Sequence, residues 1–148
     1  MDDARSHHLY SSRALNSGLW QGLQVMLTNN KAFSGFAVPD IDQARRFYGE
    51  TLGLETSVEH DLLTLHLADG RDTLVYPKPD HEPATYTILN FVVDDIEQAV
   101  DGLADRGVTF ERYDMAQQDE RGINRGEGPL IAWFKDPAGN ILSVIQLD

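Results

Sequence analysis

Two stretches of the chain share the same succession of apolar and polar positions. Each begins with a short apolar run, Phe33–Val38 in one and Thr87–Val93 in the other, and continues with apolar residues at helical spacing. The helical segments start almost identically, with Asp-Ile-Asp-Gln-Ala from Asp40 and Asp-Ile-Glu-Gln-Ala from Asp95, and 95 − 40 = 55 residues separate them. This period is too long for a helical solenoid and indicates a duplicated module of one helix and several strands.

Both modules are predicted to have the order βαβββ, because turn residues divide the remaining apolar segments into strand-length pieces. In the first module, Asp40 stands at an N-cap position and Gly53 follows the last helical turn. The strands predicted after this helix are Glu55–His60, Leu62–Ala68 and Asp72–Tyr76. The second helix is predicted from Asp95 to Arg106, and the strands after it are Val108–Arg112, Leu130–Phe134 and Ile141–Gln146.

The apolar periodicity also predicts the domain organisation. Residues 1–30 lack it and form an extension, either disordered or docked on a partner. Residues 31–147 form a single domain, with the first module at residues 31–78 and the second at residues 86–147. The polar segment Met115–Gly128 is predicted to be a long loop, which is either a lid or binding loop or simply disordered surface.

Composition narrows the possible partners. The formal charge of −12, with 12 Lys and Arg against 24 Asp and Glu, disfavours nucleic acid and acidic membrane surfaces and favours a cationic small molecule. The chain has no cysteine, which excludes disulfides and thiol chemistry. It also has no apolar run of about 20 residues and no secretory signal pattern, so we expect a cytoplasmic protein without a membrane partner.

Three motifs, taken together in order and spacing, resemble one known superfamily. They are Val38-Pro39-Asp40-Ile41-Asp42 with Phe47-Tyr48 and Leu52-Gly53-Leu54 after it, the second Asp95-Ile96-Glu97, and Phe134-Lys135-Asp136-Pro137-Ala138-Gly139-Asn140 before the last strand. In these respects residues 31–147 resemble the vicinal oxygen chelate superfamily, which includes glyoxalase I, bleomycin-resistance proteins, fosfomycin-resistance proteins and extradiol dioxygenases. The resemblance implies an α+β fold in which two tandem βαβββ modules form an open, U-shaped mixed sheet around a cavity, with helices outside.

The resemblance also implies where a divalent metal would be bound in an enzyme of this superfamily. The matching positions here carry Phe33, Leu74, Ile88 and Ser143, which lack the imidazole and carboxylate donors that such ions need. We therefore expect no metal and no cofactor at this centre. A relocated site would have to use Glu59, His60 and His66, although a hydrogen-bonded His66 and an exposed hairpin His60 explain these residues more simply.

Strand alternation predicts which side chains face the cavity and which lie under the helices. Phe36, Val38, Leu142 and Val144 are expected under the helices. The side chains expected to contact a ligand are Phe33, His66, Leu74, Tyr76, Ile88, Asn90, Trp133 and Ser143. Alternatively, Phe33 and Trp133 simply fill the space that a metal site would occupy. A triad of Ser143 with His66 and an aspartate is disfavoured, since no nucleophile-elbow sequence surrounds the serine.

Three functions are compatible with this pattern. The first is a binding protein of the bleomycin-resistance type, a homodimer that holds a planar, cationic small molecule without metal and confers antibiotic resistance. The second is an enzyme: a lyase or isomerase of the glyoxalase kind, or a dioxygenase relative, with a relocated metal, or a metal-free catalyst with His66 as general base. The third is an interaction module whose dimer surface matters more than its cavity.

Overall fold

The computed structural model describes residues 27–148, so the extension predicted at residues 1–30 lies almost entirely outside the described residues. Two units are distinguished, Met1–Ala32 and Phe33–Asp148, and of the first only a short 3₁₀ turn at Leu27–Asn29 is described. All other elements within residues 27–148 belong to the second unit. No helix in the described part of the chain is both long enough and apolar enough to span a membrane.

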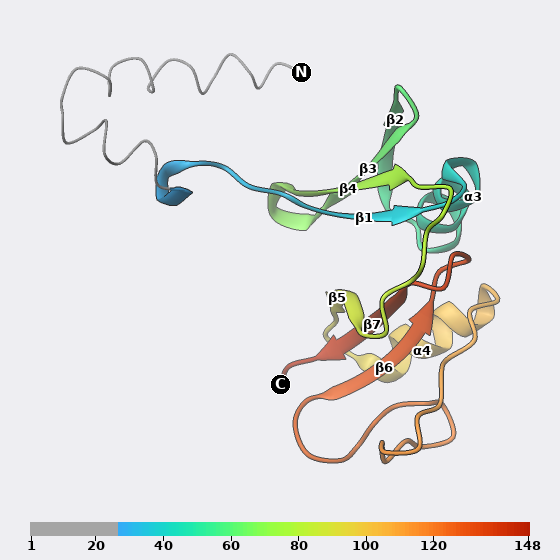
Figure 1. The fold of residues 1–148 in the computed structure, drawn as a ribbon. Helices are drawn as coiled ribbons and strands as arrows, with labels where there is room; N and C mark the ends of the chain where they lie inside the picture. The colour runs from blue at the N-terminus through green and yellow to red at the C-terminus, as the bar shows by residue number, and fades with distance from the viewer. Residues whose placement is uncertain (1–26) are drawn as a thin grey trace. The chain divides into compact units, whose positions relative to one another are not determined.

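The second unit contains two modules in tandem, as the sequence repeat predicts (Figure 1). The elements of the first are β1 (Ser34–Val38), α3 (Ile41–Arg45), the π-helix η2 (Arg46–Thr51), β2 (Glu55–Glu59), β3 (Leu62–Leu67), the turn η3 (Ala68–Gly70) and β4 (Arg71–Pro77). Those of the second are β5 (Thr87–Val92), α4 (Ile96–Asp105), β6 (Leu130–Lys135) and β7 (Ile141–Gln146). The α+β class is therefore confirmed, and the chain order of the elements agrees with the prediction except for one strand of the second module.

Each module forms its own mixed sheet, and the two sheets have equivalent strand orders. The first sheet has the order β1-β4-β3-β2, with β1 parallel to β4 and the other neighbours antiparallel. The second has the order β5-β7-β6, with β5 parallel to β7 and β6 antiparallel to it. Because β5, β7 and β6 occupy the places of β1, β4 and β3, the duplication seen in the sequence is also a duplication of topology.

The prediction of a strand over Val108–Arg112 was wrong. This segment occupies the place of β2 in the second module, but it makes only one bridge, between Phe110 and Phe134, and a hydrogen bond from Glu111 N to Trp133 O at 2.8 Å. The segment after it leaves the sheet because its polar groups are bound locally. Arg112 donates to the carbonyls of Asp119 and Glu120, and the Tyr113 amide donates to a glutamine side chain.

Both helices begin as the sequence predicts. The carboxylate of Asp40 accepts a hydrogen bond from Gln43 N at 3.1 Å, and that of Asp95 accepts one from Gln98 N at the same distance. Each cap satisfies a backbone donor that has no partner within its helix. The first helix widens into a π-helix before the chain turns at Gly53, whose φ of +77° lies in the left-handed region that favours glycine.

The helices cover one face of each sheet, and the side chains beneath them form a single buried cluster. In the first sheet Val38, Leu63, Leu65 and Val75 face the helix side and are almost completely buried. Ala132, Phe134, Leu142 and Val144 have the same place in the second sheet. Figure 1 shows α4 lying across the second sheet, which agrees with its contacts to β6 and β7. The predicted helix-facing positions of β1 and β7 are thus confirmed.

A buried polar network joins the two modules inside this core. The hydroxyl of Tyr48 in η2 donates to Asp136 Oδ2 at 2.7 Å. The Asn140 side chain donates to the same oxygen at 2.9 Å and to the Ala37 carbonyl of β1 at 3.1 Å. Burial and, to a smaller extent, the nearby Asp136 carboxylate raise the pKa of Tyr48 far above its ordinary value. The phenol therefore remains a donor throughout the range in which proteins are stable.

Replacing Tyr48 with phenylalanine tests this junction. The change removes one donor from a buried carboxylate, so we expect the free energy of unfolding to fall by about 1–3 kcal/mol, measured by urea denaturation. Tyr86→Phe is the matched control, because Tyr86 is 69% exposed. Equal stability of the two variants would show that the Tyr48 hydroxyl does not stabilise the fold.

Candidate ligand-binding site

The face of the first sheet that points away from the helices carries three of the residues predicted to bind a ligand. Strand register places Leu74 beside Gly35 and Tyr76 beside Ala37, while His66 on β3 lies beside Asp72 on β4. Tyr76 is 41% exposed, and His66 and Leu74 are partly exposed. Phe33 precedes β1 directly and is 71% exposed. This open face therefore presents aromatic and aliphatic surface with one imidazole at its side.

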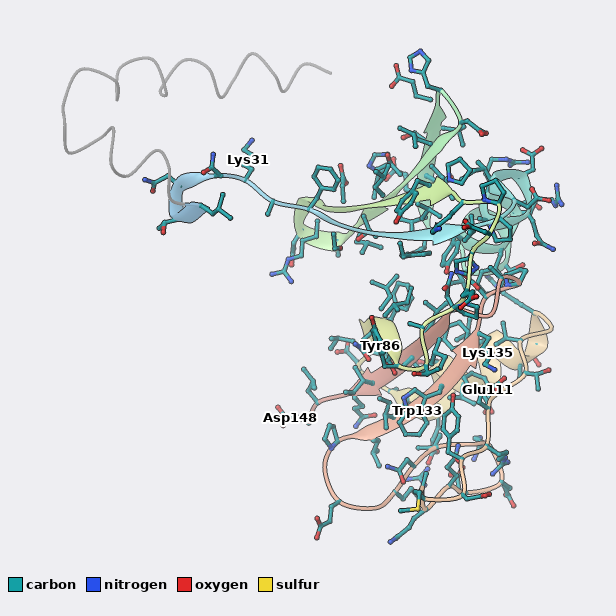
Figure 2. The ribbon with its side chains drawn as sticks, in the orientation of Figure 1. Lys31, Tyr86, Glu111, Trp133, Lys135 and Asp148 are labelled. Carbon is teal, nitrogen blue, oxygen red and sulfur yellow. The ribbon has the colours of Figure 1, made fainter. Side chains whose placement is uncertain are left out.

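The corresponding face of the second sheet carries Asn90, Trp133 and Ser143. Ser143 is completely buried and donates to Asn90 Oδ1 at 2.5 Å, while Asn90 itself is exposed. Trp133 pairs with Ser143 across β6 and β7 and alternates with the buried Ala132 and Phe134 (Figure 2). Its indole therefore lies on the open face, as predicted. Among the described residues, no hydrogen bond or aromatic contact joins this set to the one on the first sheet.

Tyr113 belongs with Trp133, although it was not predicted from the sequence. The two rings make an edge-to-face contact with their centroids 5.3 Å apart. The Tyr113 hydroxyl is buried and has no hydrogen-bond partner. Its burial and, to a smaller extent, the charge of Glu111 raise the pKa of this phenol. A buried polar atom without a partner is uncommon and unfavourable, so this hydroxyl is a candidate ligand contact. Tyr113 lies in the loop region, where strand alternation does not predict which way a side chain faces.

Ile88 lies at an irregularity in the pairing of its strand. The pairing of β5 with β7 shifts between Thr87 and Leu89, which indicates a bulge at Ile88. Ile88 packs against the buried core cluster, as does its neighbour Leu89. The prediction that Ile88 faces the open side assumed an unbroken strand, whereas the bulge interrupts this strand at Ile88.

His66 is held by two side chains on the same face. Its Nδ1 lies 3.1 Å from Asp72 Oδ1, and its Nε2 lies 2.9 Å from Ser57 Oγ. Glu59 pairs with Leu62 at the far end of the β2–β3 hairpin, and His60 is in the turn with a φ of +54°. Within residues 27–148, no group of three or more His, Asp or Glu side chains is arranged to hold a metal ion. The relocated cluster of Glu59, His60 and His66 is therefore not formed.

The four positions that the superfamily resemblance assigns to a metal do not fit one. Phe33, Leu74 and Ile88 have hydrocarbon side chains without lone pairs, and the hydroxyl of Ser143 is already hydrogen-bonded to Asn90. A divalent ion would thus have at most one weak ligand among them. We derive no chemistry through a metal at this centre.

A groove of about 320 Å³ lies on the helix side, between η2, the end of α4 and the turn after β6. None of the predicted ligand contacts lines it. Arg106 on its wall donates to the Thr51 carbonyl at 3.0 Å, and Lys135 lies 3.7 Å from Glu111 (Figure 2). Lys135 and Glu111 thus form an ion pair in this groove, whereas the partner of Arg106 is a neutral carbonyl.

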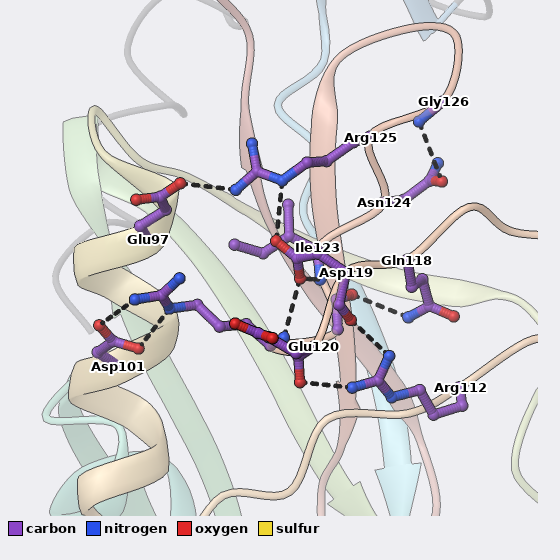
Figure 3. Close-up of polar contacts among 12 residues, drawn as sticks. Glu97, Asp101, Arg112, Gln118, Asp119, Glu120, Ile123, Asn124, Arg125 and Gly126 are labelled. Atoms are coloured by element: carbon purple, nitrogen blue, oxygen red, sulfur yellow. Dashed lines mark hydrogen bonds and ion pairs between the residues drawn. The ribbon is translucent and has the colours of Figure 1, made fainter.

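The long loop after Tyr113 is attached to the outer surface of α4 (Figure 3). Arg125 bridges Glu97 of α4, at 2.6 Å, and Asp119 of the loop, at 2.8 Å. Arg121 binds Asp101 of the same helix at 2.8 Å. Ile123 is completely buried between these contacts. The loop is thus anchored on the helix side by specific ion pairs.

Asp119 organises this loop. Its Oδ1 accepts hydrogen bonds from the backbone amides of Arg121 and Ile123, each at 2.9 Å. Partial burial acts to raise the pKa of Asp119, but the hydrogen bonds from Arg125 and these two amides outweigh it and lower the pKa. Gly122 completes the turn with a φ of +95°, and a Cβ there would lie 3.0 Å from Phe110 Cβ. Glycine is therefore required by both conformation and space.

The chain is similar to known proteins in its sequence profile and in its fold. The sequence profile of the Glyoxalase/Bleomycin resistance protein/Dioxygenase superfamily matches residues 30–144. Among curated proteins, none matches the sequence significantly.

Several solved structures share the fold. One is TnmS3, an antibiotic binding protein from Streptomyces sp. CB03234, at 22% identity over 82% of this chain and 99% of that chain, with a TM-score of 0.62. A glyoxalase/dioxygenase from Nostoc punctiforme is 17% identical over 83% and 94% of the two chains, with a TM-score of 0.61. The fosfomycin resistance protein FosX from Mesorhizobium loti is 12% identical over 80% and 92%, with a TM-score of 0.56. At these identities the likeness establishes the fold alone.

Asp119→Asn tests the anchoring of the loop through its pH dependence. Because the folded-state pKa of Asp119 is lowered, its contribution is complete above the unfolded value of about 3.9 and is lost as the pH falls through the folded value. We expect the variant to be less stable than the wild type by about 1 kcal/mol near neutral pH. The difference should shrink when urea unfolding is repeated between about pH 5 and pH 3.

The matched control for this experiment is Asp114→Asn, since Asp114 is an exposed loop aspartate. The control should match the wild type at each pH. A stability difference for Asp119→Asn that stays constant as the solution is acidified would contradict the role of its carboxylate.

Proposed function

The chain belongs to the Glyoxalase/Bleomycin resistance protein/Dioxygenase superfamily, and we propose that it is a small-molecule binding protein that holds a planar, cationic ligand without metal. The observation that carries this proposal is the constitution of the two open sheet faces. They combine aromatic and aliphatic surface with a few oriented polar groups, as small-molecule sites usually do. At the positions where enzymes of this superfamily bind their metal, these faces carry hydrocarbon side chains and a hydrogen-bonded serine.

Trp133 is the proposed anchor of the ligand. Its indole offers a large flat contact on the open face, and the edge-on ring of Tyr113 fixes its orientation. The exposed Asn90, held by Ser143, and the unpaired hydroxyl of Tyr113 supply hydrogen bonds at the edge of such a ligand. His66, Leu74, Tyr76 and Phe33 on the first sheet are proposed to contact its other side.

Two further observations support this class of ligand. TnmS3, which has the same fold, is described as an antibiotic binding protein, and FosX as a fosfomycin resistance protein. The formal charge of −12 favours a cation over an anion by long-range attraction. Sequestration of a toxic cationic compound in the cytoplasm, and hence antibiotic resistance, is the biological role that we propose.

We also propose that two copies of the chain associate through the open faces. Several large apolar side chains on or beside these faces are exposed: Phe33 at 71%, Tyr76 at 41%, Tyr86 at 69% and Val92 at 65%. Exposed apolar patches of this kind mark binding or association surfaces in soluble proteins. A second copy would cover them and enclose a ligand between equivalent faces. The same electrostatic argument disfavours nucleic acid and membrane as partners, because the net negative charge repels phosphate groups.

Of the enzyme alternatives, the metal-free one has an observation in its favour. His66 is partly exposed on the open face and is hydrogen-bonded through both ring nitrogens. The alternatives that need a relocated metal have no donor cluster among the described residues.

Fluorescence of Trp133 tests ligand binding. In a Trp20→Phe background, where Trp133 is the single remaining tryptophan, we expect saturable quenching by at least one of bleomycin, mitomycin C and proflavine. The same compound should raise the melting temperature in proportion to its occupancy of the folded state. Trp133→Leu should weaken binding about tenfold or more, since aromatic contacts are worth about 1 kcal/mol beyond their buried area. Thermal shift measures this affinity.

Met115→Ala is the control for Trp133→Leu, because Met115 is 95% exposed and is not among the proposed ligand contacts. Treatment with EDTA should leave the affinity unchanged; loss of binding on chelation would overturn the metal-free part alone. Absence of quenching and thermal shift with all three compounds would overturn the proposed ligand class.

Light scattering after size exclusion tests the proposed association. We expect twice the chain mass of 16.6 kDa for the wild-type protein. Val92→Glu places a charge in the proposed interface and should give monomers, because burying an unpaired carboxylate is strongly unfavourable. Met115→Glu, at an exposed position outside the face, should remain dimeric. A wild-type protein of single-chain mass at micromolar concentration would rule the dimer out.

A further inference from the structure

Three polar side chains meet on the open face of the first sheet, and two of them, Ser57 and Asp72, have no part in the proposed binding function. Ser57 on β2, His66 on β3 and Asp72 on β4 occupy three adjacent strands. Glu55 pairs with His66, and His66 pairs with Asp72, so these side chains share one face. Ser57, two residues beyond Glu55, is the diagonal neighbour of His66 on that face. The register of two antiparallel pairs therefore brings the three together.

The hydrogen bonds run in the order that a nucleophilic triad requires. A carboxylate can only accept, so the 3.1 Å contact of His66 Nδ1 with Asp72 Oδ1 places the proton on Nδ1 in the neutral ring. The lone pair is then at Nε2, which lies 2.9 Å from Ser57 Oγ and accepts its hydroxyl proton. Both distances lie within the range that links a nucleophile, its base and the group that orients the base.

We propose that Ser57, His66 and Asp72 form a nucleophilic triad that hydrolyses small carboxylic esters. Ser57 Oγ attacks the ester carbonyl carbon while its proton passes to His66 Nε2. Collapse of the tetrahedral intermediate breaks the bond to the alkoxy oxygen, which leaves as the alcohol with the proton from Nε2. Water then attacks the acyl-serine, gives a proton to Nε2 and releases the carboxylic acid as Ser57 recovers its proton. Ester and water thus become acid and alcohol.

The surroundings indicate the kind of ester. Ser57 is exposed on β2, the outer strand of its sheet, so the substrate approaches from solvent and must be small or present its ester at one end. An outer strand also presents backbone N–H groups without ladder partners, which are the donors that a developing oxyanion needs. Glu55 and Glu59 lie on the same face as Ser57, and their charge favours neutral or cationic esters over anionic ones.

Hydrolysis of p-nitrophenyl acetate by the full chain provides the test. We expect a rate above that of buffer, and we expect Ser57→Ala and His66→Gln each to lower the protein-dependent rate about tenfold or more. Ser34→Ala is the matched control, because Ser34 is in the same sheet but contacts Thr73, at 3.3 Å, and not a histidine. Activity that survives in Ser57→Ala and is lost in His66→Gln would show that imidazole acts alone and would overturn the proposal.

Covalent labelling gives a second measurement that needs no variant. A fluorophosphonate should modify Ser57, and trypsin should release the label in the peptide of residues 47–71, where Ser57 is the single serine. Fragmentation then distinguishes Ser57 from the threonines and tyrosine of that peptide. Label at another residue, or no label together with a rate equal to that of buffer, would overturn the triad.

Asp72 is a positioning residue in this scheme, since it touches only His66 within the triad. Asp72→Asn should lower kcat with little change in KM, and Asp72→Glu should restore part of the lost kcat. A purely structural role would instead lower the stability of both variants equally without this split. The triad needs neither Trp133 nor a planar ligand, so failure of the ligand-binding experiments and failure of this one are independent.

Discussion

The carboxylate of Asp136 accepts four hydrogen bonds in the interior of the protein. Its donors are the Tyr48 hydroxyl, the Asn140 side chain and the backbone amides of Ala138 and Asn140. A buried carboxylate is tolerated only when such donors replace its lost hydration. Because Tyr48 comes from the first module and the other donors come from the second, the charge is stabilised only when the two modules are packed together. Asn140 adds a bond to the Ala37 carbonyl of β1, so the same turn also holds the first strand.

The two modules share their helix caps and strand order but differ in the segments next to the proposed sites. Both have an aspartate cap, a helix over one face and an equivalent strand order. In the second module the place of β2 is taken by a segment with one bridge, followed by a loop anchored on α4 through Arg121 and Arg125. In the first module β2 is complete, and it carries the serine that contacts His66. The two open faces are therefore chemically different halves.

The candidate sites follow from this asymmetry. The face of the second sheet, with Trp133, Tyr113 and Asn90, is suited to a flat ligand with hydrogen-bonding edges. The face of the first sheet adds a polar row that can move a proton from a hydroxyl to an imidazole. Neither half has the carboxylate and imidazole set that a divalent ion would require at the superfamily's metal positions. The proposed binding and the proposed hydrolysis therefore rely on aromatic surface and on hydrogen-bonding side chains, among them the Asp72 carboxylate.

The sequence alone determined the features that depend on neighbours along the chain. Apolar spacing, aspartate caps and glycine stops predicted both helices and seven of the eight strands, with ends within a few residues, because these signals are local. Alternation predicted which side chains of β1 and β7 are buried under the helices, since successive residues of a strand face opposite sides. The motif resemblance identified the superfamily because its residues keep a fixed order and spacing.

Tertiary structure decided what depends on partners distant in the sequence. The segment Val108–Arg112 alternates like a strand, yet local hydrogen bonds of Arg112 and Tyr113 take the chain away from the sheet. The register shift at Ile88 interrupts the alternation on which its predicted orientation depends, and no residue type in the sequence indicates this shift. Ser57 and Asp72 were missed, although the two-residue turn at His60 and Asp61 fixes the register that brings Ser57 to His66. The junction at Asp136 was beyond local reasoning, because Tyr48 lies 88 residues away and only packing of the modules brings its hydroxyl within reach.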